Sequence, residues 1–283
     1  MFEVQAEAAS LYKFYSFNAR NLEALSEPYV WFSKLDSFND PFEGVVREVE
    51  IKGEQMLLPM MKKYLKYKHK MPAIEAEKAL LQHLLRAPEE AAAEYQQIAE
   101  DITNATRADI EKLSFFCLFR ENPERSPHEK LLMWSHYSDG LRGMRLEFDT
   151  GALLDSLEVP SGAVIAHPVK YVSEPPTVSV MDYLSLLSDK ISFKDCAEIV
   201  FNRVAFKNTA WEYEQEYRII SHQAGMARYS PDAIKEVVFG EKMPDRQKRI
   251  AYKLLRAHGS NTKFKVAKIS RWNYEIVFEE YVN

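Results

Sequence analysis

Features that would assign this sequence to a specialised class of protein are scarce. Only two of its 283 residues are cysteines, Cys117 and Cys196, and both stand in apolar or amphipathic segments, so we expect reduced thiols. The first ten residues lack the basic and apolar regions of a signal peptide. No uninterrupted apolar run is long enough to cross a membrane, and no repeat is evident. These absences predict a cytoplasmic protein that does not insert into a membrane.

The sequence also has no excess of basic charge. Its formal net charge of −5 argues against a generally basic surface for nucleic acid, although a local basic cleft would not show in the net charge. With 46% hydrophobic and 28% charged residues, the chain can bury a large core as an ordinary globular protein. Nucleic acid is therefore open as a partner but not indicated. The oligomeric state is also left open by the sequence.

Residues from about 54 to 112 differ in composition from both flanks. Pro72 and Pro88 suit the first turns of new helices, and apolar residues recur at helical spacing, among them Ile74, Leu80, Leu81, Leu84, Leu85, Tyr95, Ile98 and Ile102. The basic cluster Lys62–Lys70 has two interpretations, a phosphate grip or a solvated helix face. We predict a single domain over residues 1–283 with a helical insertion at about 54–112.

Outside the insertion, predicted strands outnumber predicted helices. The strands are expected at 11–15, 29–33, 114–119, 143–149, 163–172, 234–239, 264–269 and 274–281. They do not alternate regularly with helices, as they would in a parallel α/β fold. The pattern therefore predicts an α+β fold with a mixed or antiparallel sheet core.

The first candidate functional motif is a rigid turn at 35–44. Its Asn, Asp, Pro and Gly residues enforce a turn, while two phenylalanines attach it to a core. Asp40 precedes a proline and favours an extended backbone, which would project Asn39, Asp40 and Glu43 from the corner. The alternative is an Asx-turn, in which the side chain bonds to its own backbone.

The second motif is a short helix with clear end signals. Ser126, Pro127 and Glu129 form a capping box, and Gly140 predicts the end of the helix. His136 falls in the last turn, where the helix dipole favours its protonated form. The alternative is a histidine at the core edge that bonds to a carbonyl.

The third motif, around which we expect the chain to be organised, is Lys207 followed by a predicted strand at 211–220. Alternation predicts one aromatic face, with Trp211, Tyr213, Tyr217 and Ile219, and one ionised face, with Glu212, Glu214, Glu216 and Arg218. We expect Arg218 to hold a carboxylate, either a neighbouring glutamate or Asp40, because an unpaired guanidinium in a cleft is costly. The alternative is an edge strand with a charged solvent face.

Together, the motifs Phe38-Asn-Asp-Pro-Phe-Glu-Gly44, Met133-Trp-Ser-His-Tyr137 and Trp211-x-x-Glu214-x-Glu216-x-Arg218 resemble the bacterial domain-of-unknown-function family 2971. The resemblance extends over nearly the whole chain. It implies a fold and a set of site residues, but no reaction. The residues that it marks are Asn39, Asp40, Glu43, Trp134, His136, Tyr137, Glu214, Glu216 and Arg218.

A late Glu214-x-Glu216, an aromatic opening strand and a split β-rich core with a helical insertion are similar to ADP-ribosyltransferases. The similarity implies NAD as cofactor and a macromolecular target. Glu216 would stabilise an oxocarbenium-like transition state, and Glu214 and His136 complete the predicted catalytic set. Two features depart from the pattern: no Arg or His occupies the opening strand, and no Ser-Thr-Ser follows on the next.

Two other functions fit the same motifs. Asp40, Glu43, His136 and Glu214 would suit a metal-dependent nuclease or hydrolase. A non-enzymatic ligand-sensing or protein-interaction module would instead hold a ligand or partner protein through Asn39, His136 and Arg218. The predicted ligand-binding set is Asn39, Asp40, Glu43, Trp134, Tyr137, Lys207, Trp211 and Arg218. We expect the three motifs to converge on one cleft.

Overall fold

The computed structural model describes residues 3–4, 10–47, 59, 61–66, 69–121, 127–159, 165–177, 182, 186, 193–259 and 261–283. The chain divides into two compact units. The first unit comprises Met1–Phe38, Leu113–Tyr171 and Thr209–Asn283, and the second comprises Asn39–Lys112 and Val172–Asn208. The second unit therefore takes in the predicted helical insertion together with two further segments.

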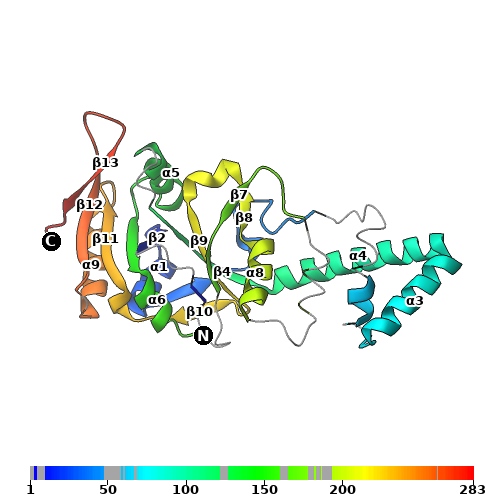
Figure 1. The fold of residues 1–283 in the computed structure, drawn as a ribbon. Coiled ribbons are helices and arrows are strands. Elements are labelled where there is room, and N and C mark those ends of the chain that lie inside the picture. The colour runs from blue at the N-terminus through cyan, green and yellow to red at the C-terminus, as the bar shows by residue number, and fades with distance from the viewer. Residues whose placement is uncertain are drawn as a thin grey trace. The chain divides into compact units, whose positions relative to one another are not determined.

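The first unit is built on a nine-stranded sheet (Figure 1). In spatial order the strands are β1 (Glu3–Val4), β6 (Ile165–Pro168), β9 (Glu216–Ser221), β4 (Ser114–Phe119), β2 (Ser10–Tyr15), β5 (Met144–Asp149), β11 (Ile234–Gly240), β12 (Lys263–Ile269) and β13 (Ile276–Glu280). The pairs β1–β6 and β11–β12 are parallel, and the others are antiparallel. The predicted α+β fold with a mixed sheet is confirmed.

Each predicted strand range contains a strand. The range 163–172 divides at Val169 into β6 and β7 (Lys170–Val172). The range 29–33 contains β3 (Tyr29–Phe32), which pairs with β10 (Gly225–Arg228) in a separate two-stranded sheet.

The nine-stranded sheet is divided at the junction of β2 and β4. These strands pair at a single position, Tyr12 opposite Phe119, whereas β4 pairs with β9 and β2 with β5 along their lengths. Lys13 enters the division, and its Nζ donates to the carbonyl oxygen of Cys117 at 2.7 Å. A side chain thus satisfies a backbone acceptor where the two strands separate.

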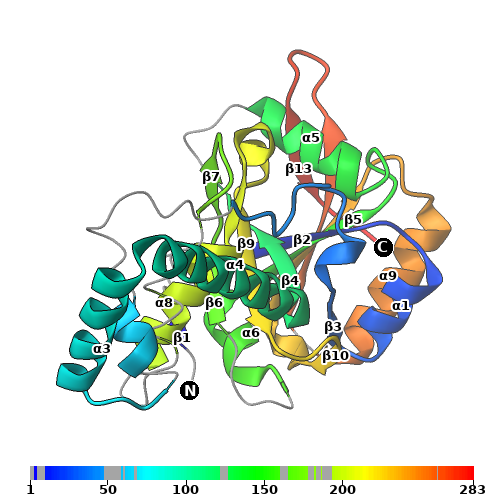
Figure 2. The same cartoon turned by 90° about the vertical axis from the view of Figure 1, so that its right-hand side faces the viewer.

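The two faces of the sheet are covered by different helices. One face packs on α1 (Ala19–Ser26), α6 (Thr150–Ser156) and α9 (Asp245–Ala257), which contribute Leu25, Leu153, Leu154, Ala251 and Leu255 to the main core. Figure 2 shows α1 and α9 lying side by side. On the opposite face, Trp134 of α5 (Pro127–Tyr137) packs against Val238 and Ala267. Alternate residues of β11 therefore serve both faces, as strand geometry requires.

Residues that define helix ends are visible at α1 and α5. Asn18 caps α1, because its side chain accepts from the N–H of Asn21 at 2.8 Å. After α5 ends at Tyr137, the chain reverses through Gly140, which has φ 58° and donates its N–H to the carbonyl of Trp134 at 3.1 Å. Ser126, the predicted N-cap of α5, lies outside the described residues.

In the second unit, α3 (Ala73–Arg86) and α4 (Pro88–Lys112) form a helical hairpin. Their contact buries Leu80, Ala91, Tyr95, Ile98 and Ile102, with Met61 from the preceding segment. Pro72 is the N-cap of α3, and Pro88 begins α4, close to the expected positions. The unit also contains α8 (Phe193–Val204) and β8 (Phe206–Asn208).

The prediction of one strand over 211–220 is wrong in its first half. Residues Thr209–Glu214 form a 3-10 helix, η2, and β9 begins only at Glu216. Gln215 links them with φ 48°, a left-handed conformation that no regular strand contains, and its N–H donates to the carbonyl of Glu212 at 3.3 Å. The aromatic residues at 211 and 213 favoured a strand, but the backbone of this segment forms a 3-10 helix instead.

No helix in the described ranges is long and apolar enough to cross a membrane.

Gly240, at the end of β11, marks a close backbone approach. A Cβ there would lie 2.1 Å from the carbonyl oxygen of Leu141. We therefore expect Gly240→Ala to lower the free energy of unfolding by about 3 kcal/mol, since backbone must shift to admit the methyl group. Urea denaturation measures the change.

Gly151→Ala, in α6, is the matched control. The Cβ would come no closer than 3.5 Å to Asp149 Oδ1, so we expect a gain of about 0.5 kcal/mol from lower entropy of the unfolded chain. Equal effects of the two substitutions would contradict the close approach at Gly240.

Candidate site at the start of β9

A buried ion pair lies at the start of β9. Glu216 and Arg218 have exposed fractions of 2% and 0%. Arg218 Nε donates to Glu216 Oε1 at 2.7 Å, and its Nη2 donates to Oε2 at 3.3 Å. The prediction that Arg218 holds a neighbouring glutamate is confirmed, and the two-pronged contact is one that only a guanidinium makes.

The register of the sheet determines where this pair lies. Glu216 and Arg218 are two residues apart in β9 and share one face, opposite Phe119 and Cys117 of β4. The rings of Phe38 and Phe115 each lie 5.6 Å from the Arg218 guanidinium carbon. Aromatic rings thus surround the cation and exclude water, which strengthens the attraction within the ion pair.

Glu214 supplies a second carboxylate. It is the last residue of η2 and is buried, and its Oε1 accepts a hydrogen bond from the hydroxyl of Tyr137. The left-handed Gln215 separates it from Glu216. The two carboxylates are therefore held by different elements and donors, and not by one face of a strand.

Three further residues join this cluster. The N–H of Glu216 donates to the hydroxyl of Tyr171 at 2.7 Å. Burial lowers the pKa of Lys13, and the nearby charges of Glu216 and Glu214 oppose this effect. Burial also raises the pKa of Tyr171 and that of Cys117, which hydrogen-bonds to Glu216 and is further raised by its charge. Cys117 is thus a protonated thiol and Tyr171 a neutral phenol.

Sequence reasoning missed Lys13, Cys117 and Tyr171. A signal existed for Lys13, because it is the one charged residue in the apolar segment 11–15. Cys117 and Tyr171 carried no such signal. Their neighbourhood depends on pairing between strands far apart in the chain.

His136 and Tyr213 form the exposed side of this region. His136 is exposed in the last turn of α5, and its Nδ1 lies 3.0 Å from the Tyr213 hydroxyl. The Tyr213 ring also lies 6.2 Å from that of Trp211. An exposed imidazole is therefore held beside aromatic side chains.

Trp134 occupies a different environment from its neighbours in α5. It is fully buried and packs edge-to-face with Phe14, with ring centres 5.2 Å apart. Tyr137 packs on Phe119 at 5.2 Å while reaching Glu214. Trp134 thus fixes α5 to the core, and the last turn of α5 places Tyr137 beside Glu214 and His136 beside Tyr213.

The remaining predicted residues, Asn39, Asp40, Glu43 and Lys207, belong to the second unit. Asp40 is buried, and its Oδ1 accepts from the N–H of Phe42 at 3.0 Å, which is the Asx-turn weighed as an alternative. Convergence of this turn with His136 and β9 stays a prediction.

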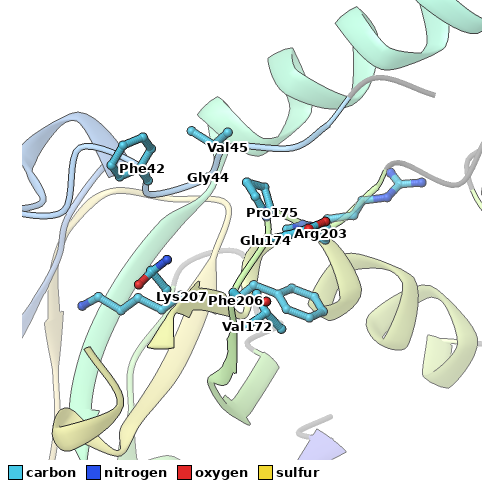
Figure 3. Close-up of a pocket in the computed structure, with 12 residues that line it drawn as sticks. Phe42, Gly44, Val45, Val172, Glu174, Pro175, Arg203, Phe206 and Lys207 are labelled. Carbon is cyan, nitrogen blue, oxygen red and sulfur yellow. The ribbon is translucent and has the colours of Figure 1, made fainter. Parts of the chain in front are cut away.

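The second unit also contains a pocket of about 230 Å³ (Figure 3). Its lining is mainly apolar and comprises Phe42, Gly44, Val45, Val172, Ser173, Glu174, Pro175, Pro176, Arg203, Phe206, Lys207 and Asn208. Arg47 stabilises one wall through an ion pair with Glu174 at 2.6 Å and an N–H bond to the carbonyl of Pro176 at 2.9 Å. Because both side chains of the ion pair are exposed, the backbone pairing of Arg47 contributes more to holding this wall.

Within the described residues, no group of three or more His, Cys, Asp and Glu side chains is placed to hold a metal ion. The carboxylates of the site are instead bound by protein donors.

Residues 133–219 match the family model of DUF2971, described as a protein of unknown function. This match confirms the family resemblance. It includes His136, Tyr137, Glu214, Glu216 and Arg218, whereas the 39–43 turn lies outside it. Comparison with curated proteins and with solved structures gives no match.

The ion pair makes Arg218→Lys a test of the site. The lysine keeps the charge but loses the fork, so we expect the free energy of unfolding to fall by about 2 kcal/mol in a water-free site. Chemical denaturation measures it.

Arg228→Lys provides a matched control, since Arg228 bonds to Glu27 at 3.0 Å with both side chains about half exposed. Here we expect a change within about 0.5 kcal/mol. A similar fall in the free energy of unfolding in both variants would show that burial does not determine how much the Arg218–Glu216 pair contributes to stability.

Proposed function

We propose that this protein is an NAD-dependent, ADP-ribosyltransferase-like enzyme acting on a macromolecular target. The observation that carries the proposal is the pair of buried carboxylates at the start of β9, each fixed by its own donor. Such preorganised charge favours a cationic transition state without reorganisation during the reaction.

The chemistry needs a stabilised positive charge. When the bond between nicotinamide and ribose breaks, its electron pair leaves with nicotinamide and positive charge develops on the ribose ring. Glu216 stabilises that charge, and Arg218 holds the Glu216 carboxylate in place. An acceptor nucleophile on the target then bonds to the ribose carbon and gives up its proton. We assign His136, which is exposed, to receive that proton.

Glu214 and Lys13 support this assignment. The hydroxyl of Tyr137 orients Glu214, which suits a carboxylate that accepts a hydrogen bond from a ribose hydroxyl. Lys13 places a basic side chain in the opening strand, where the sequence has neither Arg nor His. Its position at the division of the sheet matches the split core implied by the resemblance to these transferases.

One observation favours an alternative, a non-enzymatic ligand-sensing or protein-interaction module. The carboxylate of Glu216 already has Arg218 and Cys117 as partners inside the protein. A structural ion pair needs no substrate. A metal-dependent nuclease or hydrolase receives less support, because Glu214, one of its proposed ligands, already accepts a hydrogen bond from Tyr137.

Glu216→Gln separates these functions. We expect wild-type protein to release nicotinamide from NAD, slowly with water as acceptor, and the variant to release it about 100-fold more slowly. Chromatography of the reaction measures nicotinamide. Glu279→Gln, at an exposed pair with Lys268, is the matched control and should leave the rate unchanged.

The thermal midpoint of each variant must be measured in parallel, since Glu216→Gln removes a partner of buried Arg218. Absence of nicotinamide release by wild type, even with cell extract as acceptor, together with no stabilisation at about 1 mM NAD, would reject the transferase. Cleavage of a phosphodiester only with Mg²⁺ or Mn²⁺ would identify the hydrolase instead.

A further inference from the structure

Helix α3 carries an apolar stripe on its outer surface. Ile74, Leu81 and Leu85 have exposed fractions of 83%, 46% and 85%. They are seven and four residues apart, so they lie within about 40° of one another around the helix axis. With Lys78 included, the spacing becomes four, three and four residues, as in the seam of a coiled coil. Ile74 and Leu81 then take position d of the heptad, and Lys78 and Leu85 take position a.

The stripe is distinct from the buried face of the same helix. Ala76 and Leu80 are buried, and Leu80 and Leu84 pack in the cluster that joins α3 to α4. A soluble helix needs one apolar face for its own core, and α3 has a second. Large exposed apolar surfaces of this kind mark interaction sites.

We propose that α3 is a self-association surface, on which α3 of a second copy of this chain packs in antiparallel orientation. A twofold axis between residues 79 and 80 places Ile74 against Leu85 of the partner subunit and Lys78 against Leu81 of the partner subunit. Position a then meets position d in every layer, which is the arrangement of antiparallel coiled coils. The inference is independent of the proposed enzymatic function.

Charge along α3 selects this orientation. Exposed Glu75 lies in the first turn, and exposed Arg86 lies in the last, on the same side of the stripe. Antiparallel packing brings Glu75 close to Arg86 of the partner subunit, twice in the dimer. Parallel packing would instead turn this flank of one helix away from the same flank of the other, so no Glu75–Arg86 pair would form.

Lys78 in the central layers limits the strength of the contact. A lysine at position a specifies register but lowers stability, while its aliphatic stem still covers apolar surface. The stripe rises only about 16 Å along the helix, so the dimer belongs to the small, weak class of interfaces. We expect a dissociation constant in the micromolar range.

Sedimentation velocity of the full chain over a range of micromolar concentrations tests the proposal. Wild type should shift from monomer to dimer, whereas Leu85→Glu should stay monomeric at every concentration. Val282→Glu, at a residue 88% exposed outside α3, is the matched control and should dimerise as wild type does. Thermal midpoints should be equal at concentrations where wild type is monomeric, because all these side chains are exposed.

Charge reversal tests the orientation. Glu75→Arg and Arg86→Glu should each weaken dimerisation by about tenfold, and the double variant should restore it. A monomeric wild type, or a dimer that persists in Leu85→Glu, would overturn the self-association surface. A dimer insensitive to both single charge reversals would overturn the antiparallel arrangement.

Discussion

The ion pair between Glu216 and Arg218 is the constraint on which the polar centre of the first unit depends. Removing either charge from water costs several kcal/mol, and the attraction offsets this cost only if the geometry is good. The fork of Arg218 provides that geometry, and the rings of Phe38 and Phe115 close around it. Strands β4 and β9 must therefore keep their register, because a shift of one residue would turn both charges to the other face.

The division of the sheet between β2 and β4 allows Lys13 to join this polar centre. A continuous ladder would occupy the backbone groups of both strands along their lengths. Pairing stops at Tyr12 and Phe119 instead, and the amine of Lys13 donates to the carbonyl of Cys117. This amine thereby joins two carboxylates and Arg218 in a site of low dielectric constant. Such an arrangement suits either a fixed structural network or a preorganised reaction centre.

The two units differ in where they place charged and apolar side chains. The first places charge inside and covers it with aromatic rings, which requires every donor and acceptor to be matched. The second leaves apolar side chains of α3 outside its own core. That exposure is unfavourable in water for an isolated helix hairpin, and a second helix with the same stripe removes it. The site and the proposed self-association surface thus rest on independent features of the chain.

By itself, the sequence determined most strands of the nine-stranded sheet, the helical character of the insertion and the pairing of Arg218 with a glutamate. These properties follow from local periodicity and from residues that are neighbours in the chain. Only the tertiary structure decided that Glu214 ends a 3-10 helix and that Trp134 belongs to the core. It also decided that Lys13 reaches Cys117 across the divided sheet. Propensity is worth fractions of a kcal/mol per residue, whereas a buried polar group without a partner costs about 1–3 kcal/mol, so tertiary contacts override local preference wherever charge is buried.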